Sequence, residues 1–147
     1  MSSSSSTHGT VRLATHTDLP EILRIMTDAF IEDPAMNYFA AIRGEQPKLG
    51  SKEYSNLWLF FEFLVKAAWN SGGRITVVES SKATEGEEAV PAKIHAVSVW
   101  MPPGKRIEMH RVIILIRSGI LKPLAKWGIR GFVVRFVFSS RVRLIFP

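Results

Sequence analysis

The chain has 147 residues, of which 46% are apolar, so it is long enough for one domain with a buried core and too short for two. It contains no cysteine, which excludes disulfide scaffolds, thiolate metal sites and a cysteine nucleophile. Its net charge of +6 is unevenly placed, because residues 1–104 carry 9 basic and 12 acidic side chains, whereas residues 105–147 carry 10 basic side chains and one acidic.

The amino-terminal segment Met1–Gly9 is rich in serine and has neither the apolar run of a secretory signal nor the arginines of a mitochondrial presequence. We interpret it as a disordered tail, followed by a single domain over residues 10–147. No uncharged apolar run reaches the roughly 20 residues that a membrane-spanning helix needs. We therefore expect no transmembrane segment and a cytoplasmic location.

The first predicted elements are a short strand at Val11–Ala14 and a helix that begins after Asp18. Asp18 is a typical N-cap residue, and Pro20 and the capping acid Glu21 follow it at the positions that helix starts favour. Five apolar residues then recur with helical spacing and predict one buried stripe: Ile22, Ile25, Met26, Ala29 and Phe30.

A second helix is predicted at Tyr54–Asn70, after an irregular stretch. Pro34 disfavours helical backbone at Asp33 and predicts the end of the first helix there, and Ala35–Lys52 is typical of a loop or of broken helical turns. The apolar residues of Tyr54–Asn70 wrap too far around for a one-sided surface helix. We expect this helix to be covered on more than one side.

Two strands follow, separated by an acidic insert. Gly72 and Gly73 end the second helix, and Arg74–Glu79 is a β-branched run that predicts a strand. We interpret Ser80–Pro91 as a mobile loop and Lys93–Met101 as the next strand. Strict alternation predicts the two faces of this strand: Ile94, Ala96, Ser98 and Trp100 on one, and His95, Val97, Val99 and Met101 on the other.

After Gly104 the pattern becomes helical again, with short helices predicted around Val112–Ile116, Ile120–Trp127 and Ile129–Phe138. Glycine and proline residues separate these apolar runs. The expected fold class is α/β (α+β), with antiparallel strands 1 to 3, two packed helices and short carboxy-terminal helices.

The order strand, capped helix, aromatic helix and two-stranded hairpin resembles the amino-terminal half of the GNAT superfamily of acyl-CoA N-acyltransferases. Residues 11–104 carry the resemblance. Its amino-terminal matches are Val11, Arg12, Ala14, Asp18, Pro20, Ile22, Ala29, Phe30, Asp33 and Pro34. Its carboxy-terminal matches, a feature of fungal members, are Trp100, Pro102, Pro103 and Gly104. The resemblance implies a partial GNAT-like fold.

The same resemblance implies acetyl-CoA as the cofactor. In that family a loop after the fourth strand, with the pattern Arg or Gln, x-x-Gly-x-Gly/Ala, binds the pyrophosphate through backbone N–H groups. This pattern is absent from the 147 residues, so no cofactor-binding residue is identified. We expect a truncated N-acyltransferase that is inactive as it stands and would acetylate a small-molecule or peptide amine if completed. A truncated gene model, a splice form or a degenerate copy would each produce such a chain.

Five residues are predicted to line the acceptor side of the cleft. The resemblance places Phe30, Asp33, Pro34 and Tyr38 there, where an acidic and aromatic lining suits a cationic amine. Trp100 is a further candidate for the same lining. For each of the five, the competing interpretation is structural, namely a helix stop or a core aromatic residue, and a tryptophan in a strand usually belongs to the core.

No catalytic residue is assigned. Glu79 is a candidate general base, against the alternative of a solvated carboxylate at a strand end. His95 is interpreted as a half-exposed structural histidine. The four histidines share no metal-ligand spacing, so no metal site is proposed. No Gly-x-Ser-x-Gly elbow is present to support a serine hydrolase.

The basic carboxy-terminal part supports a second hypothesis, a non-catalytic binding protein whose basic apolar helices dock on an anionic membrane or a partner protein. A solvated face of packed helices is the structural alternative. We do not expect nucleic-acid binding, because basic and aromatic residues are not interleaved in an RNA-reading pattern. The cations concerned are Arg111, Arg117, Lys122, Lys126, Arg130 and Arg135.

Solubility follows from the same resemblance. A complete GNAT domain has a fourth strand, and without it one edge of Lys93–Met101 is open. The apolar segments Val112–Ile116 and Phe132–Phe138 then have too little structure to cover them. We predict that the chain is poorly soluble or oligomeric.

Overall fold

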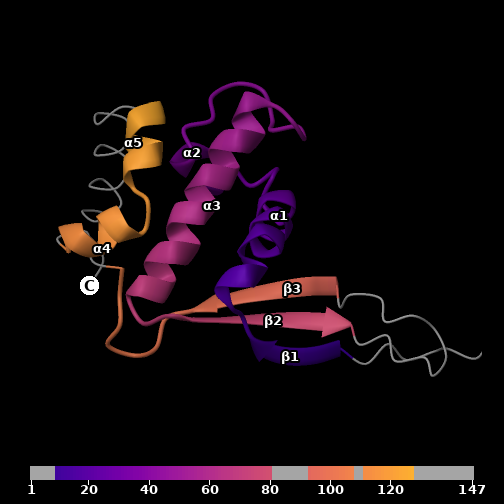
Figure 1. Ribbon diagram of the computed structural model, residues 1–147. Helices are drawn as coiled ribbons and strands as arrows, with labels where there is room; N and C mark the ends of the chain where they lie inside the picture. Colours follow the sequence, from indigo (N-terminus) through magenta and orange to yellow (C-terminus); the bar gives the residue numbers. More distant parts are fainter. Residues whose placement is uncertain (1–8, 81–92, 108–110, 128–147) are drawn as a thin grey trace, which may run out of the picture.

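A computed structural model describes residues 9–80, 93–107 and 111–127, and Figure 1 shows their arrangement. In chain order the elements are β1 (Gly9–Leu13), a 3₁₀ turn (His16–Asp18), α1 (Leu19–Ala29), α2 (Pro34–Phe39), α3 (Lys52–Asn70), β2 (Arg74–Ser80), β3 (Lys93–Trp100), α4 (Val112–Arg117) and α5 (Leu121–Trp127). The described part is therefore a mixed α+β fold, and the predicted combination of antiparallel strands and helices is confirmed. The predicted tail, acidic loop and third short helix fall mainly or wholly on residues outside the described ranges.

The sheet has the strand order β1-β2-β3, and both pairs of neighbouring strands are antiparallel. Figure 1 shows α1 and α3 on the same side of this sheet. On the opposite side, Val11 and Leu13 of β1 and Trp100 of β3 are exposed. Within the described residues, the outer edge of β3 pairs with no further strand.

The register of β2 and β3 shifts at His95, which is an extra residue in β3 and forms a β-bulge. A bulge reverses the alternation of side chains along a strand, so Ile94 before it and Val97 after it both pack against the core. The predicted faces, which put Ile94 with Trp100 and His95 with Val97, are therefore wrong.

The main hydrophobic core lies between the sheet and the helices α1 and α3, and it contains Ile22, Leu57, Phe61 and Val77. A second, smaller cluster lies on the other side of α3, where helices α4 and α5 cover it. The prediction that the aromatic helix is covered on more than one side is confirmed (Figure 1).

The predicted stripe of α1 is confirmed except at its Ala29 position, since the other four residues pack in or against the core: Ile22, Ile25, Met26 and Phe30. Ala29 is exposed, whereas Leu23 and Thr27 are buried beside Ile22. Because α1 contacts both α3 and β3, its covered face is wider than one helical stripe. Tyr54 links α3 to α1, since its hydroxyl donates a hydrogen bond of 2.8 Å to Asp28. Burial and this hydrogen bond raise the pKa of Tyr54 to about 12.

The hydroxyl of Thr27 has no hydrogen-bond partner although the residue is fully buried. An unpaired buried hydroxyl costs about 1–3 kcal/mol relative to water, and valine has nearly the same shape without it. We therefore expect Thr27→Val to raise the free energy of unfolding by about 1 kcal/mol in urea denaturation of the full chain. A loss of stability in this variant would mean that the hydroxyl has a partner in solution.

Candidate functional site

The predicted acceptor side lies where α1 ends and α2 begins. Phe30 is half-buried after the last residue of α1, and its ring centroid lies 5.6 Å from that of Phe61. Asp33 is the N-cap of α2, and its Oδ1 accepts a hydrogen bond of 2.8 Å from the backbone N–H of Met36. Pro34 occupies the first position of α2, where proline is favoured because no intrahelical N–H is needed there.

Tyr38 is exposed on α2. The next residue, Phe39, packs α2 against α3. The rings of Phe39 and Phe60 are stacked, with centroids 6.1 Å apart. Tyr38 packs edge-on against Phe39, at 5.7 Å between centroids. The structure therefore carries Asp33 and Tyr38 on one short segment, with a half-buried aspartate at its start and an exposed tyrosine near its end.

Trp100 is placed apart from this segment. It pairs with Arg74 in the register of β2 and β3. Its neighbour Val99 packs against the core, so Trp100 lies on the opposite face of the sheet. Its side chain is 54% exposed, so the expectation that a strand tryptophan belongs to the core is wrong here. The β-bulge reverses the alternation of side chains along β3, so Trp100 points away from the helices. The fold therefore does not bring Trp100 together with the predicted residues of α2.

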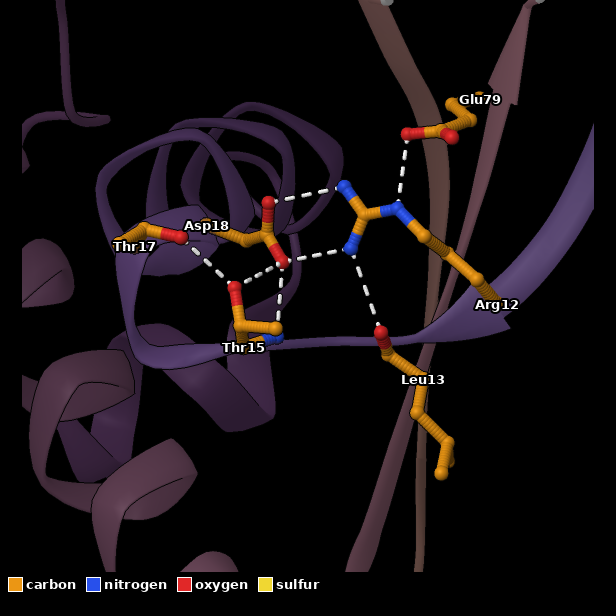
Figure 2. Close-up of polar contacts among 6 residues, drawn as sticks. All are labelled: Arg12, Leu13, Thr15, Thr17, Asp18 and Glu79. Carbon is orange, nitrogen blue, oxygen red and sulfur yellow. Dashed lines mark hydrogen bonds and ion pairs between the residues drawn. The ribbon is translucent and has the colours of Figure 1, made fainter.

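A charged cluster joins the start of the domain to β2, and it is centred on Arg12 (Figure 2). The guanidinium donates to both carboxylate oxygens of Asp18, at 2.7 and 2.9 Å, and to Glu79 at 2.8 Å. Asp18 also accepts a hydrogen bond of 2.7 Å from the backbone N–H of Thr15 and one of 2.9 Å from its hydroxyl. The cluster therefore fixes the turn between β1 and α1 against β2.

The contacts of this cluster assign structural roles to two residues. Asp18 stands at the N-cap of α1, but its side chain accepts no hydrogen bond from that helix, so the predicted capping interaction is wrong. Glu79 is held by the guanidinium of Arg12, and its side chain is only 20% exposed. The interpretation of Glu79 as a solvated strand-end carboxylate is therefore wrong too.

The pKa of Asp18 lies well below its ordinary range, chiefly because Arg12 hydrogen-bonds to the ionised carboxylate. A carboxyl group with a depressed pKa stabilises the fold above its unfolded-state pKa of about 4, and this stability is lost as the pH falls toward its folded-state value. We expect Asp18→Asn to be less stable than the wild type at neutral pH, and the difference to shrink below about pH 4.

Urea denaturation at several pH values measures this difference. Glu21→Gln is the matched control, because Glu21 pairs with Arg24 at a more exposed position, where such pairs contribute about 0–1 kcal/mol. A difference between wild type and Asp18→Asn that is the same at pH 7 and pH 3 would contradict the role assigned to the Arg12 contact.

His95 is exposed at the bulge, and its Nε2 lies 3.0 Å from the hydroxyl oxygen of Ser80 on the neighbouring strand. This contact joins β3 to β2, and the interpretation of His95 as a structural histidine stays a prediction. In the described ranges no group of three or more acidic or histidine residues is arranged to hold a metal ion. Over the same ranges no helix combines the length and apolar character needed to cross a bilayer.

No family model, curated protein or solved structure matches this chain. The GNAT resemblance therefore depends on the residues quoted from the sequence alone.

Proposed function

We propose that residues 9–104 form the acceptor-binding part of an N-acyltransferase of the GNAT type, acting on an amine. The observation that carries the proposal is the order β1, α1, α2, α3, β2, β3, with both long helices on one face of an antiparallel sheet. Apart from the short helix α2, which lies where a loop or broken helical turns were expected, this order is the one that the resemblance implies. The exposed outer edge of β3 within the described residues is where the family's fourth strand would pair.

The segment at the start of α2 supplies the chemistry for a cationic amine. Asp33 uses Oδ1 for the helix cap, and a carboxylate has further acceptor sites that an ammonium group can occupy. The exposed ring of Tyr38 and the half-buried ring of Phe30 provide aromatic surface, which attracts cations. In this proposal Asp33 binds the ammonium group and the two rings contact the rest of the acceptor.

The described residues do not fit a pyrophosphate group. Backbone N–H groups bind pyrophosphate where a loop after a strand leads into a helix, whereas Gly72 and Gly73 lie between α3 and β2. The space beside Gly73 is filled as well, since a Cβ there would lie 2.7 Å from the carbonyl oxygen of Ala68. We therefore assign no residue to acetyl-CoA and derive no acyl-transfer step for this chain.

Titration of the full chain with phenethylamine, followed by NMR of labelled backbone amides, tests the acceptor site. We expect saturable shifts over Asp33–Tyr38, and weaker binding by about tenfold or more in Asp33→Asn, because hydrogen bonds to charged groups contribute about 1.5–3 kcal/mol. Asparagine caps helices as well as aspartate does, so this variant removes the charge and keeps α2. N-acetylphenethylamine, which has no ammonium group, is the ligand control.

Absence of saturable shifts, or equal affinity in Asp33→Asn, would contradict the acceptor site. Two further measurements address the enzyme class. Labelled acetyl-CoA should transfer no acetyl group in the presence of the 147-residue chain, and transfer would overturn our statement about the cofactor. The mature transcript beyond the codon for Pro147 should encode a strand followed by the pyrophosphate pattern, and an immediate stop codon would argue against catalysis by this product.

A further inference from the structure

Helix α4 and the start of α5 expose a group of aliphatic side chains. Ile113 is 72% exposed and Val112 is 59% exposed, and Ile116 and Leu121 are exposed as well. At about 100° per residue, Val112, Ile113, Ile116 and Arg117 fall within an arc of about 140° on α4. Leu121, the first residue of α5, falls at the edge of the corresponding exposed arc of that helix. We call these residues the α4–α5 outer face.

Three cations lie on the same exposed arcs as these aliphatic side chains. Arg117 lies at the edge of the exposed arc of α4, and it forms no ion pair within the described residues. Lys122 and Lys126 lie on the exposed arc of α5. Neither α4 nor α5 contains an acidic residue, and Glu62 of α3 lies beside Lys122. Helices α4 and α5 therefore present cations and no carboxylate beside the outer face.

The opposite sides of both helices are fixed to α3. Leu115 and Ile120 are buried against Phe63 and Ala67. The buried Ser118 receives a hydrogen bond of 2.9 Å from the side-chain amide of Asn70. The outer face is therefore held in place by the second hydrophobic cluster and does not have to fold before it can bind.

Two lysines of α5 also contact α3, and their ammonium groups lie beside the α4–α5 outer face. Lys122 lies 3.4 Å from Glu62, but its side chain is largely exposed. Lys126 donates a hydrogen bond of 3.0 Å to the hydroxyl of Ser55. These ammonium groups are at the protein surface, where Lys side chains can extend toward an anionic layer.

We propose that the α4–α5 outer face docks on an anionic lipid surface, with its aliphatic side chains inserted at the headgroup boundary and the neighbouring cations against lipid phosphates and carboxylates. Charge complementarity carries the choice of occupant, since cations beside a lipid surface each contribute about a fivefold gain in partition. Nucleic acid fits less well. Its bases are bound by stacking on aromatic side chains, and the exposed residues here are aliphatic.

The test is sedimentation of the full chain with vesicles of phosphatidylcholine alone and of phosphatidylcholine with phosphatidylserine. We expect binding to the anionic vesicles at low salt, and loss of most of it at high salt because the screening length becomes shorter. Absence of binding at low salt would overturn the proposal. Equal binding to both kinds of vesicle would remove its electrostatic part and overturn it as well.

Two variants separate the two parts of the interaction. Arg117→Gln should lower the partition coefficient about fivefold. Ile113→Asp should lower it by about tenfold or more, because it removes an inserted side chain and adds a negative charge. Leu49→Asp is the matched control, since Leu49 is 84% exposed but precedes α3, outside α4 and α5.

Circular dichroism should show that all three variants remain folded, because each substituted side chain is exposed. If Ile113→Asp and Leu49→Asp bind equally well, the outer face is not the docking surface. If Ile113→Asp binds as the wild type does while vesicle binding remains dependent on salt, the lipid contact lies elsewhere on the basic part of the chain.

Discussion

Phe61→Ala should lower the free energy of unfolding by about 3–5 kcal/mol, the range for a large aromatic residue removed from a packed core. Phe61 is 1% exposed, and its ring centroid lies 5.6 Å from that of Phe30 and 5.5 Å from that of Phe60. The cavity would therefore open between α1 and α3, in the middle of the main core. For a domain whose total stability is about 5–15 kcal/mol, this loss is a large fraction.

Urea denaturation of the full chain, followed by circular dichroism, measures the loss. Leu49→Ala is the control, and it should change stability by no more than about 0.5 kcal/mol because Leu49 is 84% exposed. If Phe61→Ala does not fold, Phe61→Leu should still fold with a smaller loss, since it leaves a smaller cavity. A loss below about 1 kcal/mol in Phe61→Ala would show that Phe61 is not in the core.

Gly73→Ala should lower the free energy of unfolding by about 3 kcal/mol, because there is no space for a side chain where α3 turns into β2. A Cβ at this position would lie 2.7 Å from the backbone oxygen of Ala68 and 2.8 Å from the sulfur of Met101. The methionine can move, but the carbonyl of Ala68 is fixed by α3 and already accepts a hydrogen bond of 2.7 Å from the N–H of Gly73.

The neighbouring glycine gives a matched comparison for this prediction. Gly72 has a φ of 81°, so alanine there costs about 1 kcal/mol in backbone strain, but its nearest contact would be the Lys105 side chain at 3.7 Å. Urea denaturation should therefore place Gly72→Ala between the wild type and Gly73→Ala. A Gly73→Ala variant as stable as Gly72→Ala would show that α3 and β2 separate easily at this junction.

Local signals in the sequence predict most of the elements. The paired glycines mark the end of α3, the β-branched run marks β2, and Pro102, Pro103 and Gly104 end β3, which stops at Trp100 in the structure. Helical spacing also predicts α4 and α5. These signals involve only a few neighbouring residues, so they can be recognised in the sequence without knowledge of tertiary contacts.

Features that depend on tertiary contacts were missed. An inserted residue in a strand leaves no mark in the pattern of apolar and polar side chains, so the bulge at His95 and the exposure of Trp100 were not predicted. The Arg12 cluster links β1 to a partner 67 positions away, Glu79. A possible signal was available, because alternation along β1 puts Arg12 on the same face as Ala14, toward the helices.

In the candidate site, too, the residues that are close in sequence could be predicted and the distant one could not. Proline at the start of α2 and the aspartate before it predict a helix boundary, and the structure places Asp33 and Tyr38 on that short segment. Whether Trp100 lies on the same face of the sheet as α2 depends on the alternation of side chains along β3, and the bulge at His95 changes that alternation. Only the contiguous part of the predicted acceptor side was therefore accessible from sequence.

Helix α3 contributes side chains to both hydrophobic clusters, so the helices differ in how much of the core their opening exposes. Opening α4 and α5 uncovers the smaller cluster around Phe63 and Ala67 but removes only Trp127 from the contacts of the larger one. Opening α3 exposes both clusters at once. The carboxy-terminal helices can thus separate in a partial, low-energy fluctuation, whereas exchange of the α3 amide protons with solvent requires unfolding of the whole domain.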